Sequence, residues 1–247
     1  MVATGVSIDE QRGCPIIKDG ITYVPSYEPQ EAVDRQAYFN PNDSDDKGGG
    51  DDKGRHGKTR RPNRKFWLTR DVKKAVAYLT TPPEVTKAAH VLWPRADEVI
   101  RVLTETKGKN MYFDIETNRS LEMTCFGFSF DEKRAWCVPM VVSPREGYYY
   151  SDTPRILRAL AVAMRDNTTV IHNSLFDLFV MGYKYGIPAP RRVYDTMLAH
   201  HRLFPEVEKS LGHCLSLYTD QPYHKNEGVF EAHGHEQQTQ LYEYNAK

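Results

Sequence analysis

The order of strand-like and helix-like segments after residue 110 restricts the fold more than any other feature of this sequence. Three consecutive segments are rich in aromatic and β-branched residues; a helix-like, a strand-like and a second helix-like segment follow. These segments are NMYFDIE (110–116), MTCFGFSF (123–130), RAWCVPMVV (134–142), SDTPRILRALAVAMR (151–165), TTVIHN (168–173) and SLFDLFVMGYKYG (174–186). The sequence therefore predicts an α/β fold whose mixed central sheet, a three-strand antiparallel meander plus a further parallel strand, is flanked by helices.

The predicted helices carry end signals and apolar stripes. In 151–165, Thr153 is expected to be the N-cap and Pro154 the first helical residue. The helix over 174–186 is expected to end at Gly186, and its spacing predicts a buried stripe of Phe176, Phe179, Val180 and Tyr183. Further helices are predicted over 72–79, 96–106, 195–203, 210–219 and the C-terminal segment.

Charge and composition divide the 247-residue chain into three parts. Residues 1–39 hold too few apolar residues to bury a core of their own and are expected to be an N-terminal extension. Residues 40–65 are rich in glycine and charge, acidic in the first half and basic in the second, and are predicted to be a flexible linker. The basic half could lie along phosphates, although a solvated linker is the favoured interpretation. Residues 66–247 are expected to form the globular domain.

Composition also restricts the class of protein. The net charge is zero, so bulk charge indicates no partner. No apolar stretch approaches the roughly 18 residues of a membrane span, and the N-terminus lacks the apolar region of a signal peptide. The cysteines lie far apart without a CxxC pair, which favours reduced thiols: Cys14, Cys125, Cys137 and Cys214. We therefore expect a cytoplasmic protein with no membrane partner.

The segment FDIET (113–117) places two acidic residues on one strand. Asp114 and Glu116 are two residues apart, so both carboxylates face the same side, while Phe113, Ile115 and Thr117 pack on the other. Two like charges this close are unfavourable without a cation, and Mg²⁺ prefers carboxylate oxygens. The pair is therefore a candidate metal site, with a strand that has one wet face as the alternative.

A second polar cluster follows the predicted strand 168–173. In HNSLFD (172–177), Asn173 and Asp177 are four residues apart and share a helix face. An acid near the core edge requires a partner. The alternative is that Asn173 is an N-cap and Asp177 a surface residue.

Taken together and in this order, FDIET and HNSLFD resemble the first two motifs of the DEDD 3′–5′ exonucleases, which have the ribonuclease H-like fold. Residues 109–247 resemble the proofreading exonuclease domain of family A DNA polymerases, especially bacteriophage ones. The resemblance extends over VYDTMLAHHRLFPEVEKSLGHCLSLYTDQPYHK, which is similar to the region after motif two in phage polymerases. It implies a location in the host cell cytoplasm if the protein is phage-encoded.

The third motif of this family is Tyr-x-x-x-Asp on a helix. The sequence supplies Tyr244 and ends at Lys247, immediately before the position of the aspartate. In the family that aspartate is a ligand of the metal on the nucleophile side. Losing a ligand or its support costs about 10- to 100-fold in metal affinity or activity, so the resemblance implies an impaired enzyme in this exact chain.

The resemblance also implies the roles of individual residues in a two-metal hydrolysis with Mg²⁺ or Mn²⁺. Asp114 would bridge both ions, Glu116 would hold the nucleophile-side ion, and Asp177 would support the second. Tyr244 would orient the attacking water. Thr117, Leu121 and Asn173 would contact the terminal nucleotide of a single-stranded DNA 3′ end or primer terminus. A DNA polymerase domain or chain would be the protein partner.

Two alternatives to this function remain open. The chain could be an inactive domain that binds single-stranded DNA or docks a polymerase, or an RNA-directed relative similar to ribonuclease D.

The N-terminal segments GVSIDEQRG and YVPSYEPQEAVD weakly resemble the end of a uracil-DNA glycosylase-like domain. That family has a His-Pro-[Ser/Ala] loop where this chain has Glu28-Pro29-Gln30, so glycosylase activity is not expected. Asp195 is interpreted as an N-cap of the following helix rather than as a site residue.

Overall fold

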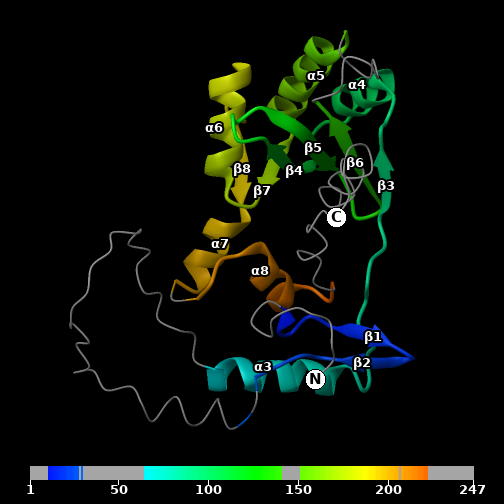
Figure 1. Ribbon diagram of the computed structural model, residues 1–247, viewed down its shortest axis with the longest axis vertical. Coiled ribbons are helices and arrows are strands. Elements are labelled where there is room, and N and C mark those ends of the chain that lie inside the picture. Colours follow the sequence, from blue (N-terminus) through cyan, green and yellow to red (C-terminus); the bar gives the residue numbers. More distant parts are fainter. Residues whose placement is uncertain (1–10, 28, 30–63, 141–150, 206, 222–247) are drawn as a thin grey trace, which may run out of the picture. The chain divides into compact units, whose positions relative to one another are not determined.

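The computed structural model describes residues 11–27, 29, 64–140, 151–205 and 207–221 (Figure 1). These residues fall into two compact units. One contains the described residues within Met1–Val85 and His200–Tyr223, and the other those within Thr86–Ala199. Most of the predicted linker, all but Pro29 of the glycosylase-like tripeptide, and Tyr244 lie outside the described residues.

The second unit is built on a six-stranded mixed sheet with the strand order β3-β6-β5-β4-β7-β8. Its strands are β3 (Ala89–Leu92), β4 (Asn110–Thr117), β5 (Met123–Ser129), β6 (Arg134–Pro139), β7 (Thr168–Ile171) and β8 (Val193–Asp195). β4, β5 and β6 pair antiparallel, β7 pairs parallel to β4, and β8 pairs parallel to β7. The predicted meander with a further parallel strand is confirmed. The structure adds β8 and, parallel to β6, β3.

Four helices accompany this sheet: α4 (Ala96–Glu105), α5 (Thr153–Asp166), α6 (Ser174–Tyr185) and α7 (Thr196–Leu203), the last of which continues into the other unit. α4 and α5 contact each other and bury their apolar stripes against the meander. Leu103 and Leu160 are fully buried there, in one cluster with Phe126 of β5. This core fixes β4, the strand that carries the first acidic motif. No helix in the described part of the chain is long and apolar enough to cross a membrane.

Two helix details differ from the sequence predictions. α5 begins at Thr153 and its N-cap position is Asp152, one residue earlier than predicted. In α6 the predicted stripe is wrong: Val180 is buried, but Phe176, Phe179 and Tyr183 are exposed. The residues of α6 that are buried are Asp177, Val180 and Met181. The physical reason is that an acid occupies the core-facing position of the first turn, which rotates the aromatic residues outward. The helix ends as predicted, with Gly186 in the left-handed region at φ 64°.

The first unit combines residues that are far apart in the sequence. It contains the hairpin β1 (Ile16–Lys18) and β2 (Ile21–Tyr23), α3 (Arg64–Ala77) and α8 (Leu211–Tyr218). α3 begins eight residues before the predicted helix, because its first turns supply buried positions such as Trp67. Trp67 packs with Tyr27 and Leu217, so the described N-terminal residues share a core with α3 and α8.

Candidate active site

β4 places the two acids of FDIET on one side of the sheet. Phe113 and Ile115 point into the core and are buried, whereas Asp114 is exposed and Glu116 half-buried. This alternation follows from the two-residue period of a strand. The pairing of β4 with β5 shifts register between Glu116 and Thr117, so the strand is irregular immediately after the second acid. The predicted same-side placement of the two carboxylates is confirmed.

α6 brings Asp177 to the acidic strand. Asp177 is 3% exposed, and its Oδ1 accepts a hydrogen bond from the backbone N–H of Ile115 at 3.1 Å. Ile115 is the residue between Asp114 and Glu116, so this bond joins the two motifs directly. The alternative interpretation of Asp177 as a surface residue is therefore wrong.

The electrostatics of this junction are unbalanced. Burial and, second, the negative charge of Asp114 raise the pKa of Asp177 to about 7, against the lowering effect of the Ile115 N–H. Glu116 adds a smaller effect in the same direction. The neighbouring carboxylates oppose the ionisation of Asp177, and a divalent cation bound between these acids would stabilise their ionised forms. The chemistry of the three acids therefore fits a hard divalent metal.

The described residues do not by themselves form a closed ligand cluster. Among them, no group of three or more His, Cys, Asp or Glu side chains is close enough together to hold a metal ion. Asp114, Glu116 and Asp177 thus interact electrostatically without forming a complete metal cage. Tyr244, the candidate from the third motif, lies outside the described residues.

The start of α6 is held by Asp195, an acid that was predicted only as the cap of the next helix. Asn173 occupies the N-cap position in the left-handed region, at φ 68°, and its side chain makes no capping hydrogen bond. Asp195 Oδ2 instead accepts from the backbone N–H and the hydroxyl of Ser174, both at 2.7 Å. Its Oδ1 accepts from the N–H of Met197 at 2.8 Å, which confirms the predicted cap of α7. Asp195 therefore positions α6, and Asp177 with it.

The other predicted substrate contacts lie around the β4–β5 turn. Thr117 is the last residue of β4, and Leu121 lies in the turn with φ 60°, partly buried against the core. The hydroxyl of Tyr185 in α6 accepts from the N–H of Met123 at 2.7 Å, which ties this turn to α6. No sequence motif marks Tyr185, so this contact was not predicted. The roles of Thr117, Leu121 and Asn173 in substrate binding remain predictions.

Two of the described histidines, His200 and His172, have structural partners. His200 is buried, with Nδ1 2.7 Å from the Tyr218 hydroxyl and Nε2 2.9 Å from the Glu208 carbonyl oxygen. His172 Nδ1 lies 2.9 Å from the Thr196 hydroxyl. Both ring nitrogens of His200 are engaged, so it has no nitrogen left for a metal.

Comparison with protein-family models gives no match, and comparison with curated proteins gives none either. Solved structures do match. They include the Nibbler EXO domain of Aedes aegypti, with 14% identity over 66% of this chain and 84% of that chain and a TM-score of 0.48. RNase D of Escherichia coli, an exoribonuclease involved in structured RNA processing, has 16% identity over 65% of this chain and 40% of that chain, with a TM-score of 0.46. NrnC of Brucella melitensis with bound Mg²⁺ has 17% identity over 66% of this chain and 74% of that chain, with a TM-score of 0.38.

The fold class follows from the topology. The antiparallel meander, the parallel strands added beyond β4 and the flanking helices form the ribonuclease H-like α/β arrangement predicted from the sequence. In this arrangement the first acidic motif lies on the central strand β4, and the second lies on the helix that follows the neighbouring strand β7.

Proposed function

We propose that this chain is a divalent-metal-dependent 3′–5′ exonuclease domain that hydrolyses the 3′-terminal nucleotides of DNA. The observation that carries the proposal is the hydrogen bond from the Ile115 N–H to the buried Asp177 carboxylate. It joins two acidic motifs that are 62 residues apart, in the order and on the elements that the exonuclease resemblance requires.

In this proposal Asp114, Glu116 and Asp177 would hold two Mg²⁺ or Mn²⁺ ions. When bound, such ions lower the pKa of a coordinated water and stabilise the charge of an in-line displacement. The protein contributes the positions of the acids. β4 packs on the core, and Asp195 holds the start of α6, and both contacts support the proposal because they hold the elements that carry the three acids.

The proposed substrate is a single-stranded DNA 3′ end or primer terminus. Asn173, Thr117 and Leu121 would contact the terminal nucleotide, and Tyr244 would orient the attacking water. The similarity of residues 193–225 to the segment after motif two in phage family A polymerases supports proofreading as the biological role, with a polymerase domain or chain as partner. An inactive domain that only binds single strands is the competing proposal.

A direct assay uses single-stranded DNA labelled at the 5′ end, with Mg²⁺ or Mn²⁺ and with EDTA as the control. The proposal predicts a ladder of products shortened from the 3′ end in metal and none in EDTA. A parallel RNA oligonucleotide of the same sequence tests the ribonuclease D-like alternative, because an RNA-directed enzyme would favour the strand with 2′-hydroxyls. Tight binding of the DNA without any shortening would favour the inactive binding domain.

A further inference from the structure

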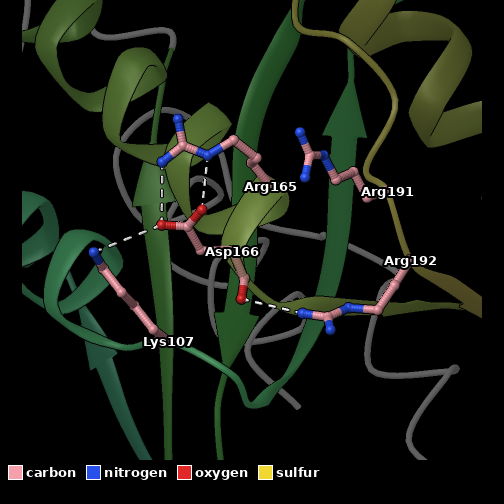
Figure 2. A pocket seen from close by; sticks show the side chains of 5 residues that line it. All are labelled: Lys107, Arg165, Asp166, Arg191 and Arg192. Atoms are coloured by element: carbon pink, nitrogen blue, oxygen red, sulfur yellow. Dashed lines mark hydrogen bonds and ion pairs between the residues drawn. The ribbon is translucent and has the colours of Figure 1, made fainter.

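A pocket of about 400 Å³ lies away from the acidic motifs and is lined almost entirely by cations (Figure 2). Its lining residues are Lys107, Arg165, Asp166, Arg191 and Arg192. Four positive charges and one negative charge give the lining a net charge of +3. The whole chain is neutral, so this is a local concentration of positive charge rather than a general property of the surface.

The sheet places this pocket at the opposite end from the candidate active site. Lys107 lies just before β4, Arg165 and Asp166 just before β7, and Arg191 and Arg192 just before β8. β4, β7 and β8 are mutually parallel, so their N-terminal ends lie side by side at the same end of the sheet. Asp114 and Glu116 lie toward the other end of β4. At about 3.3 Å per residue the two sites are separated by roughly 20 Å along the strand.

A buried asparagine holds the frame of the pocket. The Asn167 side chain donates to the carbonyl oxygens of Thr106 and Ala163 and accepts from the N–H of Lys109, each at 2.9 Å. The N–H of Gly108 donates to the carbonyl oxygen of Asp166 at 3.1 Å, and Gly108 has φ 67°. These hydrogen bonds fix the connection that carries Lys107 to the end of α5. The backbone segments that carry Lys107, Arg165 and Asp166 are therefore held together by the fold itself.

The single carboxylate of the pocket cannot balance its cations. Asp166 forms a two-point contact with Arg165, at 2.7 and 3.1 Å, and lies 3.8 Å from Lys107. Arg192 Nη2 donates to the Asp166 carbonyl oxygen at 3.3 Å. Arg191 has no ion pair or hydrogen bond within the described part of the chain. The C-terminus of α5 accounts for about half a charge of compensation, which leaves the guanidinium charges of Arg191 and Arg192 unbalanced.

Guanidinium groups are suited to phosphate, because their planar N–H donors match pairs of phosphate oxygens. We propose that this four-cation pocket binds phosphate groups of the sugar–phosphate backbone of a nucleic-acid strand, as a contact separate from the acidic site. The choice of nucleic acid as ligand rests on the proposed function. Phosphate contacts of this kind position a strand without reading its sequence.

The test measures binding in EDTA, where no metal-dependent hydrolysis occurs. A fluorescent single-stranded DNA oligonucleotide is titrated with the full chain at several salt concentrations, and the anisotropy gives Kd and its salt dependence. The pocket variant is Arg191→Ala/Arg192→Ala. The matched control is Arg101→Ala/Lys133→Ala, which removes two exposed cations elsewhere in the same unit.

Each lost phosphate contact lowers the magnitude of the slope of log K against log salt by about 0.7 for a single strand. The slope of the pocket variant should therefore be smaller by about 1.4. That change corresponds to about 25-fold weaker binding at 0.1 M salt if binding at 1 M salt is unchanged. The control variant should keep the slope of the wild type. Arg191→Ala alone should lose about half of the change in slope. Equal losses in the pocket and control variants, or an unchanged slope in the pocket variant, would overturn the proposal.

Two further comparisons are needed. One distinguishes a nucleic-acid ligand from a free phosphate compound, and the other separates this inference from the proposed function. If the pocket variant loses ³¹P NMR line broadening of inorganic phosphate but binds the oligonucleotide like the wild type, the ligand is a free phosphate compound and the proposal fails. Absence of hydrolysis in Mg²⁺ combined with the expected pocket effect would refute only the proposed function. Normal hydrolysis with no pocket effect would refute only this inference.

Discussion

Replacing Arg12 with leucine should destabilise the unit that contains α3 and α8. The Arg12 and Asp71 side chains are each 3% exposed, and Arg12 Nη1 donates to Asp71 Oδ1 at 2.8 Å. The Arg12 guanidinium also lies 4.3 Å from the centre of the Trp67 ring and 3.3 Å from the Ser216 hydroxyl. Arg12→Leu removes all three interactions. Among the described residues, Asp71 then keeps the Ser26 hydroxyl, at 2.6 Å, as its side-chain hydrogen-bond partner.

The magnitude follows from the uncompensated charge. Burial already raises the pKa of Asp71, while the hydrogen bond from Ser26 and the charge of Arg12 lower it. Removing one partner of a buried ion pair costs about 3–5 kcal/mol, because the other charge stays buried without compensation. At about 1.4 kcal/mol per factor of ten, that is roughly a 140- to 3,700-fold increase in the population of the open state.

Hydrogen–deuterium exchange read by mass spectrometry can locate this effect. Amides in α3 and α8 should lose protection by that factor at neutral pH, whereas amides in β4 and β5 of the other unit serve as the internal control. The double variant Arg12→Leu/Asp71→Asn removes the buried charge and should regain about 2 kcal/mol or more of the loss. Unchanged exchange in α3, or a double variant no more protected than the single one, would refute the reasoning.

Three further predictions concern stability. Burial lowers the pKa of His213 to about 4, and its buried Nε2 has no hydrogen-bond partner among the described residues, so the folded state favours the neutral ring. Stability should therefore fall as pH drops from about 6.5 toward 4, and His213→Phe should remove most of that slope in urea unfolding. Asp195→Ala leaves the first N–H groups of both α6 and α7 without their acceptor and should cost about 1–3 kcal/mol, seen as a lower unfolding midpoint. Asp195→Asn should lose less, because the amide oxygen can still accept a hydrogen bond, and equal losses in the two variants would contradict this role of the acceptor oxygen. Gly186→Ala meets open space but keeps a left-handed backbone, so it should cost about 1–2 kcal/mol from backbone strain alone, and a stabilised variant would contradict this.

The sequence predicted the central sheet because β4, β5, β6 and β7 are runs of aromatic and β-branched residues that follow one another closely. β8 was not predicted, because a strand of three residues is too short to show a period. β3 has four residues, as β7 has, but its sequence AHVL lacks the run of β-branched residues that marks TTVI as a strand. Both lie at the edges of the sheet, where pairing with a long neighbour decides their conformation.

The acids of the candidate site could be predicted from the sequence, but the contacts that orient the elements carrying them could not. Asp114, Glu116 and Asp177 were predicted as site residues because their spacing on a strand and a helix carries a motif. The orientation of α6 was not found, because the pattern of its apolar residues pointed to Phe179 and Tyr183 as the buried face. The contacts of Asp195 with Ser174 and of Arg12 with Asp71 join residues 21 and 59 positions apart, and local spacing carries no signal for such pairs.

The most direct test of the central claim, that Asp114 and Asp177 share a divalent-metal site, is a Mn²⁺ binding isotherm measured by electron paramagnetic resonance. Asp114→Asn and Asp177→Asn should each weaken Mn²⁺ binding by about 10- to 100-fold relative to the wild type. Glu132→Gln, an exposed acid in the β5–β6 turn, should bind as the wild type does. Equal Mn²⁺ affinity in the wild type and in both aspartate variants would contradict the claim.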